Sequence, residues 1–309
     1  MNIGRTHWWG GACVLLMLGA CGALPRGEKP PPGAQHGTPL PDAGTVVGAY
    51  NTRVRDLDRL RAPITLVIDS PKEGGGGGRS RDQVDGSLQV MLPSSVALRI
   101  DKVGQALAYL GSNDDTYWWF DLGDQKRAYV GAHALASPEK ARRFGLPVHP
   151  LDLMELAGVT PLPNASLLTL AWTNDGLLQV RVPGRWSSRR LVLDPRSYEP
   201  TRIEIIDRGG RVAAGANLSR YQRVDVDRLA TSPARIAGQV EIEIADADVR
   251  ASLAIVEPRN PGERLRLKAF DLAAMLDSYN IKDVRDMDAP AVSVPAQSPA
   301  EPTAPSGGA

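Results

Sequence analysis

The sequence has almost no cysteine. Two occur in 309 residues, Cys13 and Cys21, and none follows position 21. Beyond that point the chain can therefore form no disulfide, no thiolate nucleophile and no cysteine-based metal site. In an oxidising envelope compartment such a fold must hold without covalent cross-links.

Long apolar runs are also missing. The stretch GGACVLLMLGA, from Gly10, is shorter than the roughly 20 apolar residues that a membrane-spanning helix needs. It follows a single charged residue, Arg5, and ends in small side chains. This pattern is typical of the apolar centre of a secretory signal, so the sequence predicts a signal peptide over 1–20.

Neither sign of charge dominates. From Cys21 onward, 35 basic residues (the 36 of the chain less Arg5) face 35 acidic ones. The chain lacks the basic stripe of a nucleic-acid-binding protein, so we expect no nucleic-acid partner. No GxSxG, HExxH or paired-carboxylate motif occurs, and we therefore expect no enzyme and no cofactor. His133 and His149 have no evident nucleophile nearby and are interpreted as surface or capping residues.

The residues Leu18-Gly19-Ala20-Cys21 resemble the lipobox of bacterial lipoproteins. The resemblance implies that the signal is cut before Cys21, that its sulfur carries diacylglycerol, and that the new amino terminus takes an acyl chain such as palmitate. Each buried CH2 contributes about 0.8 kcal/mol, so two or three chains hold a protein stably at a membrane. The alternative is an ordinary secretory signal with an incidental cysteine.

Proline-rich tails flank the central sequence. Six prolines fall between positions 22 and 44 and five between 288 and 309. Such segments bury too little surface to offset the entropy of ordering them. We therefore expect a lipidated, disordered tether over 21–44, one domain over 45–285, and a disordered tail over 286–309.

The central sequence is dominated by a period of two. One amphipathic helix is predicted over 46–61, with Thr45 as its N-cap and Pro63 as its stop, and shorter helices near 149–157 and 271–279. Strands with one solvent-exposed (wet) face and one buried (dry) face are predicted at 64–69, 86–92, 96–101, 106–110, 116–121, 127–131, 167–172, 178–182, 189–193, 201–206, 214–222, 239–244, 250–256 and 264–269.

The five glycines 74–78 lack the lysine of a phosphate loop and predict a flexible hairpin tip.

Three short helices cannot cover the dry face of so many strands. The fold class expected is therefore mainly β, with a curved antiparallel sheet that closes or half-closes on itself and a few short helices as lid or filler. Such a sheet either encloses a cavity or collapses into a sandwich.

The order of lipobox, proline tether, amphipathic helix and long antiparallel meander resembles the periplasmic lipoprotein carriers LolA and LolB. GSNDDTYWWFDL (111–122) and LVLDPRSYEPTRIEIIDRGGRV (191–212) are similar to hairpins of that group. The resemblance implies an unclosed (half) β-barrel with a helical lid over an apolar cavity that holds acyl chains. The long tails and the EGGGGGR insertion (73–79) depart from the family.

Two clusters are candidate contact sites. In TYWWF, alternation places Trp118 and Phe120 on one face and Tyr117 and Trp119 on the other. We take Trp118, Trp119 and Phe120 as candidate ligand contacts, with core packing on both faces as the alternative.

The second cluster is PGRWSSRR. Arg185, Trp186, Arg189 and Arg190 could meet anionic headgroups, each cation adding about 1 kcal/mol. A polar hairpin loop is the alternative.

The sequence thus favours a non-catalytic lipoprotein of the bacterial outer membrane, facing the periplasm. It would bind or transfer lipid, or the acyl chains of lipoproteins, in an apolar cavity. Its partners would be those chains, the membrane through the lipid anchor, and an envelope protein. One alternative is a structural or envelope-sensing interaction module of the same fold with a filled core. Another is an envelope hydrolase.

Overall fold

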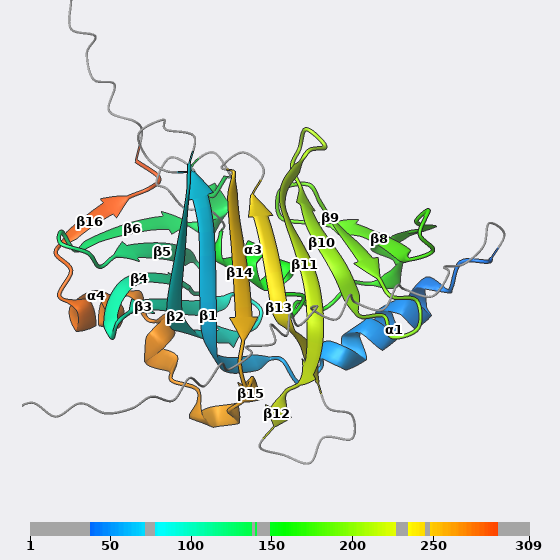
Figure 1. The fold of residues 1–309 in the computed structure, drawn as a ribbon, viewed down its shortest axis with the longest axis horizontal. Coiled ribbons are helices and arrows are strands. Elements are labelled where there is room, and N and C mark those ends of the chain that lie inside the picture. Colours follow the sequence, from blue (N-terminus) through cyan, green and yellow to red (C-terminus); the bar gives the residue numbers. More distant parts are fainter. Residues whose placement is uncertain are drawn as a thin grey trace, which may run out of the picture.

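The structure is a computed structural model that describes residues 38–71, 78–137, 140, 149–226, 234–244 and 248–289. Its described part forms one large sheet flanked by the helices α1 (Ala43–Val54), α3 (Pro150–Leu156) and α4 (Leu272–Tyr279) (Figure 1). None of these helices is long and apolar enough to cross a bilayer. The expected signal peptide, Cys21, the tether up to residue 37 and the tail from residue 290 lie outside the described residues.

Sixteen strands pair within the described residues. They are β1 (Arg59–Pro71), β2 (Arg79–Met91), β3 (Ser95–Lys102), β4 (Gln105–Ser112), β5 (Thr116–Asp121), β6 (Arg127–Ala132), β7 (Thr169–Trp172), β8 (Leu178–Pro183), β9 (Ser188–Leu193), β10 (Pro200–Ile206), β11 (Val212–Arg223), β12 (Asp225–Val226), β13 (Arg235–Ile244), β14 (Val249–Ile255), β15 (Arg259–Asn260) and β16 (Asp283–Asp286). The main path runs β16-β6-β5-β4-β3-β2-β1-β14-β13-β11-β10-β9-β8-β7, and the short β12 and β15 pair off it.

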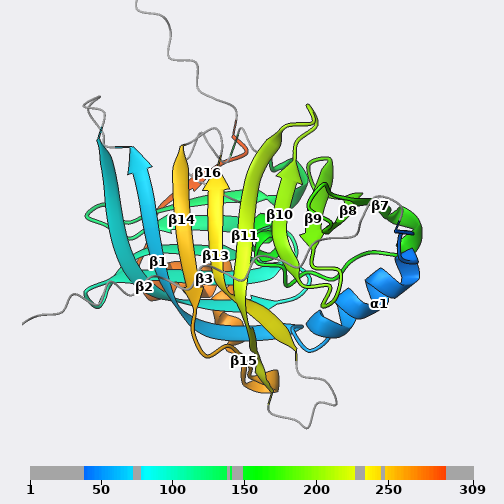
Figure 2. The same ribbon diagram turned by 45° about the vertical axis from the view of Figure 1, so that its right-hand side comes forward.

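The sheet is strongly curved. Strands β3 to β6 cross behind β1, β14 and β13 at a steep angle, and α3 lies between these two layers (Figures 1 and 2). The two end strands, β7 and β16, do not pair with each other in the described part of the chain. The expected fold class, an unclosed half barrel with a few short helices, is confirmed.

Alternation of buried and exposed residues follows the predicted period. Strand β9, for example, buries every second residue, and β8 does the same in the opposite phase. Most strands bury their dry face in one large core inside the curve. A second, smaller core lies on the outer face, where α4 and the preceding 3-10 turn η5 (Leu267–Phe270) cover part of β3 to β6.

The first helix differs from the prediction at both ends. The helix α1 begins at Ala43 with Asp42 as N-cap, which accepts a hydrogen bond from the Thr45 amide at 2.9 Å, and it ends at Val54. Residues 59–61, predicted as helix, belong to β1, and Pro63 lies inside that strand. Long-range pairing with β2 along the whole of β1 outweighs the local helical spacing.

The prediction of a strand at 264–269 is also wrong. That stretch forms two 3-10 turns, η4 (Gly262–Arg264) and η5, closed by local bonds such as the Ala269 amide to the Arg266 carbonyl at 3.1 Å. Local i to i+3 bonds therefore replace sheet pairing here. The glycine-rich insertion does connect a hairpin, because β1 and β2 pair up to Pro71 and Arg79, although residues 72–77 lie outside the described part.

Candidate functional site

An apolar pocket lies inside the curve of the sheet. It has a volume of about 130 Å3 and is open to solvent on one side. All of its lining residues are hydrophobic and come from β1, β3, β4, β5, β13, β14 and α3. They are Leu66, Ile68, Leu98, Ile100, Leu110, Trp119, Leu153, Ile242, Ile244, Val249, Ala251 and Leu253.

The period-two pattern creates this pocket. Leu98 and Ile100 on β3 and Leu110 on β4 point to the inside of the curve and are more than nine-tenths buried. Leu66 and Ile68 on β1 stay partly exposed, so we place the mouth of the pocket at their end of the strand. A surface that is apolar throughout and still partly wet can bury an apolar ligand with a favourable free energy.

Helix α3 closes one side of the pocket through Leu153. Its N-cap is His149, a buried residue whose Nδ1 accepts a hydrogen bond from the Leu151 amide at 3.2 Å. Because Nδ1 is an acceptor, the neutral ring carries its proton on Nε2, which lies 3.3 Å from Nδ1 of His133. Nε2 of His133 then donates to the Asn113 carbonyl at 2.8 Å. The expected capping role is confirmed for His149, and His133 positions it.

Burial sets the ionisation of these groups. Desolvation, with smaller contributions from Arg185 and His133, lowers the pKa of His149 to about 2. The same cause lowers the pKa of His133. Desolvation raises the pKa of Asp152 on α3 to about 7, although its Oδ2 accepts a 2.7 Å hydrogen bond from Nε1 of Trp186. The polar groups around the N-terminal part of α3, here called the base of α3, are therefore buried and largely uncharged.

The other end of α3 is held by α1. Asn51 forms two bonds with Leu162: its side-chain nitrogen donates to the carbonyl at 3.0 Å, and its oxygen accepts from the amide at 2.8 Å. The Arg53 guanidinium donates to the Gly158 carbonyl at 2.7 Å and to the Arg235 carbonyl at 2.9 Å. Helix α1 thus fixes the segment after α3 against the end of β13.

The aromatic cluster divides between the two faces as expected. Trp119 lines the apolar pocket, and Tyr117 packs against His149 with a centroid distance of 4.5 Å. Trp118 and Phe120 are fully buried in the second core on the outer face. Trp118 lies flat on Gly111, where an added Cβ would stand 2.2 Å from Nε1. Of the three candidate ligand contacts, Trp119 alone reaches this pocket.

The predicted headgroup cluster does not form a free basic surface. Three of its members face α3: Trp186 donates to Asp152, Arg185 lies 3.7 Å from the same carboxylate, and Arg189 lies 3.8 Å from Glu155. Arg190 pairs with Glu204 on β10, which also binds Arg202 at 2.7 Å. The sequence shows the charges but not Glu155 and Glu204, which pair with Arg189 and Arg190, because these partners are distant in sequence.

The arrangement has a limited chemistry. It offers apolar contact, one indole and a buried polar cluster that does not open into the apolar pocket. No group of three or more His, Cys, Asp or Glu that could hold a metal occurs among the described residues. The geometry therefore fits binding of an apolar ligand.

Comparison with known proteins gives matches among solved structures alone, since no family model and no curated protein matches the chain. The chain is similar to a LolA superfamily protein from Nitrosomonas europaea (11% identity, TM-score 0.47, covering 75% of this chain and 98% of that one). It is also similar to a candidate outer membrane lipoprotein-sorting domain from Vibrio parahaemolyticus (11%, 0.49, 75% and 99%). A DUF1329 family protein from Desulfovibrio piger matches at 12%, with a TM-score of 0.48 and coverage of 74% and 98%. The first of these three proteins belongs to the superfamily that the sequence resembles.

Proposed function

We propose that this protein is a non-catalytic carrier that holds an acyl chain, of a lipid or of an acylated protein, in the apolar pocket. The observation that carries the proposal is a pocket lined throughout by hydrophobic residues and open to solvent at the β1 end. Sites for apolar ligands are typically concave and lined mainly by hydrophobic side chains, as this pocket is.

The volume suggests how a chain would enter. An apolar cavity of about 150 Å3 takes up a molecule the size of benzene, so 130 Å3 accommodates one segment of an acyl chain. A longer ligand needs the wall to move. Helix α3 is the wall that can do so, because it is not paired into the sheet, whereas the other lining residues lie on paired strands. Its shift would break the Trp186–Asp152 hydrogen bond. We propose α3 as the movable lid.

The place of action follows from the amino terminus. We propose a signal peptide over 1–20, lipidation of Cys21 and a flexible tether over 21–44 that links the domain to the bacterial outer membrane on its periplasmic side. The domain of 45–285 would then reach acyl chains near the membrane surface, and residues 286–309 would form a free tail. Mass spectrometry of the amino terminus tests this, because an unmodified Cys21 would contradict it.

Binding can be tested on one strand with a matched pair of variants. Leu66 lines the mouth of the pocket, while its neighbour Val67 points to the opposite face and is also partly exposed. A fluorescent fatty acid is titrated into the purified full-length protein. We expect Leu66→Asp to weaken binding by at least about tenfold, because a carboxylate at the mouth must be desolvated beside the chain. Val67→Asp should bind like the wild type; equal binding by all three proteins would contradict the proposal.

The modest volume of the pocket favours a second candidate function, an interaction module that binds an envelope protein and carries no lipid. Organic extraction of the full-length protein separates the two. Lipid recovered in stoichiometric amount in excess of the covalent anchor supports the carrier. An empty domain that also resists fatty-acid probes supports the interaction module.

A further inference from the structure

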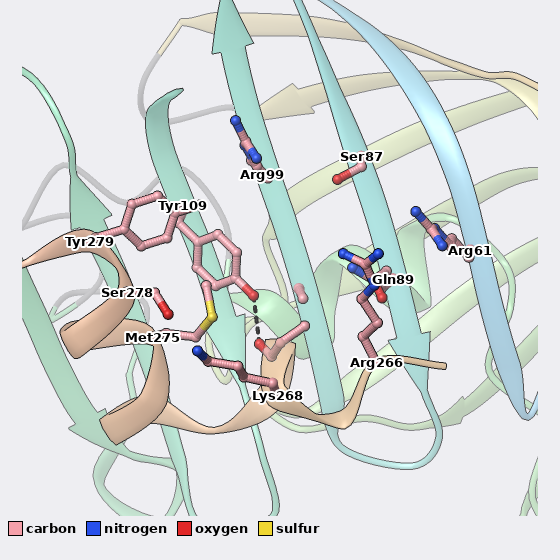
Figure 3. Close-up of a pocket in the computed structure, with 12 residues that line it drawn as sticks. Arg61, Ser87, Gln89, Arg99, Tyr109, Arg266, Lys268, Met275, Ser278 and Tyr279 are labelled. Atoms are coloured by element: carbon pink, nitrogen blue, oxygen red, sulfur yellow. Dashed lines mark hydrogen bonds between the residues drawn. The ribbon is translucent and has the colours of Figure 1, made fainter. Parts of the chain in front are cut away.

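A second pocket lies on the outer face of the same sheet. It has a volume of about 420 Å3, within the range of roughly 300–1,000 Å3 typical of small-molecule sites. Its floor is formed by β1 to β4, and its rim by the segment around η5 together with α4 (Figure 3). It is separate from the apolar pocket, because the two are built from alternate residues of the same strands.

The charge in this pocket is of one sign. Four cations line it, Arg61 from β1, Arg99 from β3, and Arg266 and Lys268 from the rim, and no carboxylate does. Arg99 pairs with Asp101 at 2.8 Å. Within the described residues, no carboxylate lies within salt-bridge distance of the other three. Cations that line one pocket without counter-charge repel one another, and an anion bound between them would relieve that repulsion.

Polar groups suited to a hydroxylated ligand lie beside the cations. Ser87 and Gln89 on β2 and Ser278 on α4 line the same pocket. Oε1 of Gln89 is buried and has no hydrogen-bond partner. A buried acceptor without a partner is costly, and a ligand hydroxyl could supply the missing donor. Gln89 lies opposite Arg61 in the pairing of β1 and β2, and Arg266 lines the same pocket (Figure 3).

The opposite side of the pocket is aromatic and rigid. Tyr109 and Tyr279 approach with a centroid distance of 5.7 Å, and Met275 packs beside them (Figure 3). The Tyr109 hydroxyl donates to the Ala269 carbonyl at 2.5 Å, which fixes the rim to the sheet. Such a wall suits the apolar face of a sugar ring, while the cations suit a phosphate.

We propose that this outer pocket binds a phosphorylated sugar or polyol, with the phosphate held by Arg61, Arg266 and Lys268 and a hydroxyl bonded to Gln89. The ligand can come from two sources that share this chemistry: a soluble sugar phosphate or the phosphorylated sugar headgroup of a lipid. The site is independent of the acyl-chain pocket and stands if that proposal fails.

The test uses the purified full-length protein and isothermal titration with glucose 6-phosphate, inorganic phosphate and neutral glucose. A parallel arm measures sedimentation of a Cys21→Ser form, which carries no lipid anchor, with phosphatidylcholine vesicles that contain or lack lipid A. The variant Arg266→Ala/Lys268→Ala removes two of the ligating cations. The matched control, Arg181→Ala/Arg223→Ala, removes two exposed arginines of β8 and β11 that do not line the pocket.

We expect saturable binding of glucose 6-phosphate, of lipid A vesicles or of both, weakened at least about tenfold in the first variant and unchanged in the control. Binding of the soluble ligand alone, or of the vesicles alone, identifies the source. Gln89→Met should weaken glucose 6-phosphate but not inorganic phosphate. The proposal is overturned if neither ligand binds, if glucose binds as well as its phosphate, or if the two double variants lose affinity equally.

Discussion

The two faces of strands β1 to β4 carry opposite chemistry although they share one backbone. Leu98 points into an apolar hollow, and its neighbour Arg99 points into a cationic one. What covers each face differs as well: α3 closes the inner pocket with a hydrophobic side chain, whereas the chain around η5 and α4 adds two cations to the outer one. Strand alternation assigns each residue to a face, and the covering segment decides what that face can bind.

The largest expected effect on stability comes from placing a charged residue on the apolar face of β3, compared with an apolar residue on its charged face. Leu98→Arg places a charge on the buried face and should reduce the free energy of unfolding by about 3–5 kcal/mol. Arg99→Leu removes an exposed cation whose pair with Asp101 contributes about 0–1 kcal/mol, so stability should barely change. Urea unfolding measures both. Similar losses in the two variants would mean that the faces are not distinct.

A smaller loss is expected from truncating the lid. Leu153→Ala enlarges the inner pocket and should lower the free energy of unfolding by about 2–3 kcal/mol. The loss is at the low end for such truncations because the pocket is already partly open and α3 can move into the space left by the side chain. Fatty-acid binding should persist, since the added space is apolar. Calorimetry and probe titration give the two values. Loss of binding in a folded variant would contradict this expectation, because the chain would then depend on the Leu153 side chain and not on apolar space.

The ionisable groups at the base of α3 should change the free energy of unfolding with pH in two opposite directions. The pKa of Asp152 is raised from 3.8 to about 7, so the folded state holds a proton that the unfolded state releases, and stability falls as pH rises through that window. The pKa of His149 is lowered from 6.5 to about 2, so stability falls as pH drops below about 6.5. His133 acts in the same direction as His149. Between about pH 4 and 6.5 the contributions of Asp152 and His149 largely cancel.

Asp152→Asn removes the pH-dependent contribution of Asp152 and leaves that of the histidines. The new amide oxygen can still accept the hydrogen bond from Trp186. The variant should then gain stability with rising pH between about 5 and 6.5, by up to ~1.4 kcal/mol per pH unit for each histidine. At about pH 8 it should exceed the wild type by on the order of 1 kcal/mol, because Asp152 no longer has to ionise beside Glu155 while buried. Urea unfolding across this range is the measurement, with the exposed Asp277→Asn as control. Parallel pH profiles of wild type and variant would contradict this account.

The smallest expected change is that of fatty-acid affinity at the inner pocket when salt is added. Glucose 6-phosphate binding at the outer pocket provides the comparison. Raising sodium chloride from about 0.05 to about 0.5 M should weaken glucose 6-phosphate binding severalfold, because the Debye length shortens. Fatty-acid binding should stay within about twofold, since it rests on apolar burial. Equal salt dependence would assign both ligands to one site.

Sequence alone predicts the strands well because their dry faces repeat every second residue. It fails where other forces prevail: β1 is taken partly for helix because Leu57 and Leu60 also fit a helical spacing, and residues 264–269 alternate like a strand but form 3-10 turns. For β1 the pairing with β2 decides the structure, whereas residues 264–269 close local i to i+3 hydrogen bonds instead of pairing as a strand.

The candidate sites show the same limit. Alternation correctly separates Trp118 from Trp119, but it cannot tell which face is the hollow one. The outer pocket brings together Arg61, Gln89 and Lys268, which are up to about 200 residues apart in the chain, and no local motif marks them. The neutralisation of Arg189 and Arg190 by Glu155 and Glu204 is hidden for the same reason.

A crystal structure of the full-length protein grown with oleate tests the central claim most directly. We expect one acyl chain between β1, β14 and α3, in contact with Leu66, Trp119 and Leu153, and α3 shifted outward to admit it. An empty inner pocket in the presence of saturating oleate, or a chain bound elsewhere on the sheet, would contradict the account.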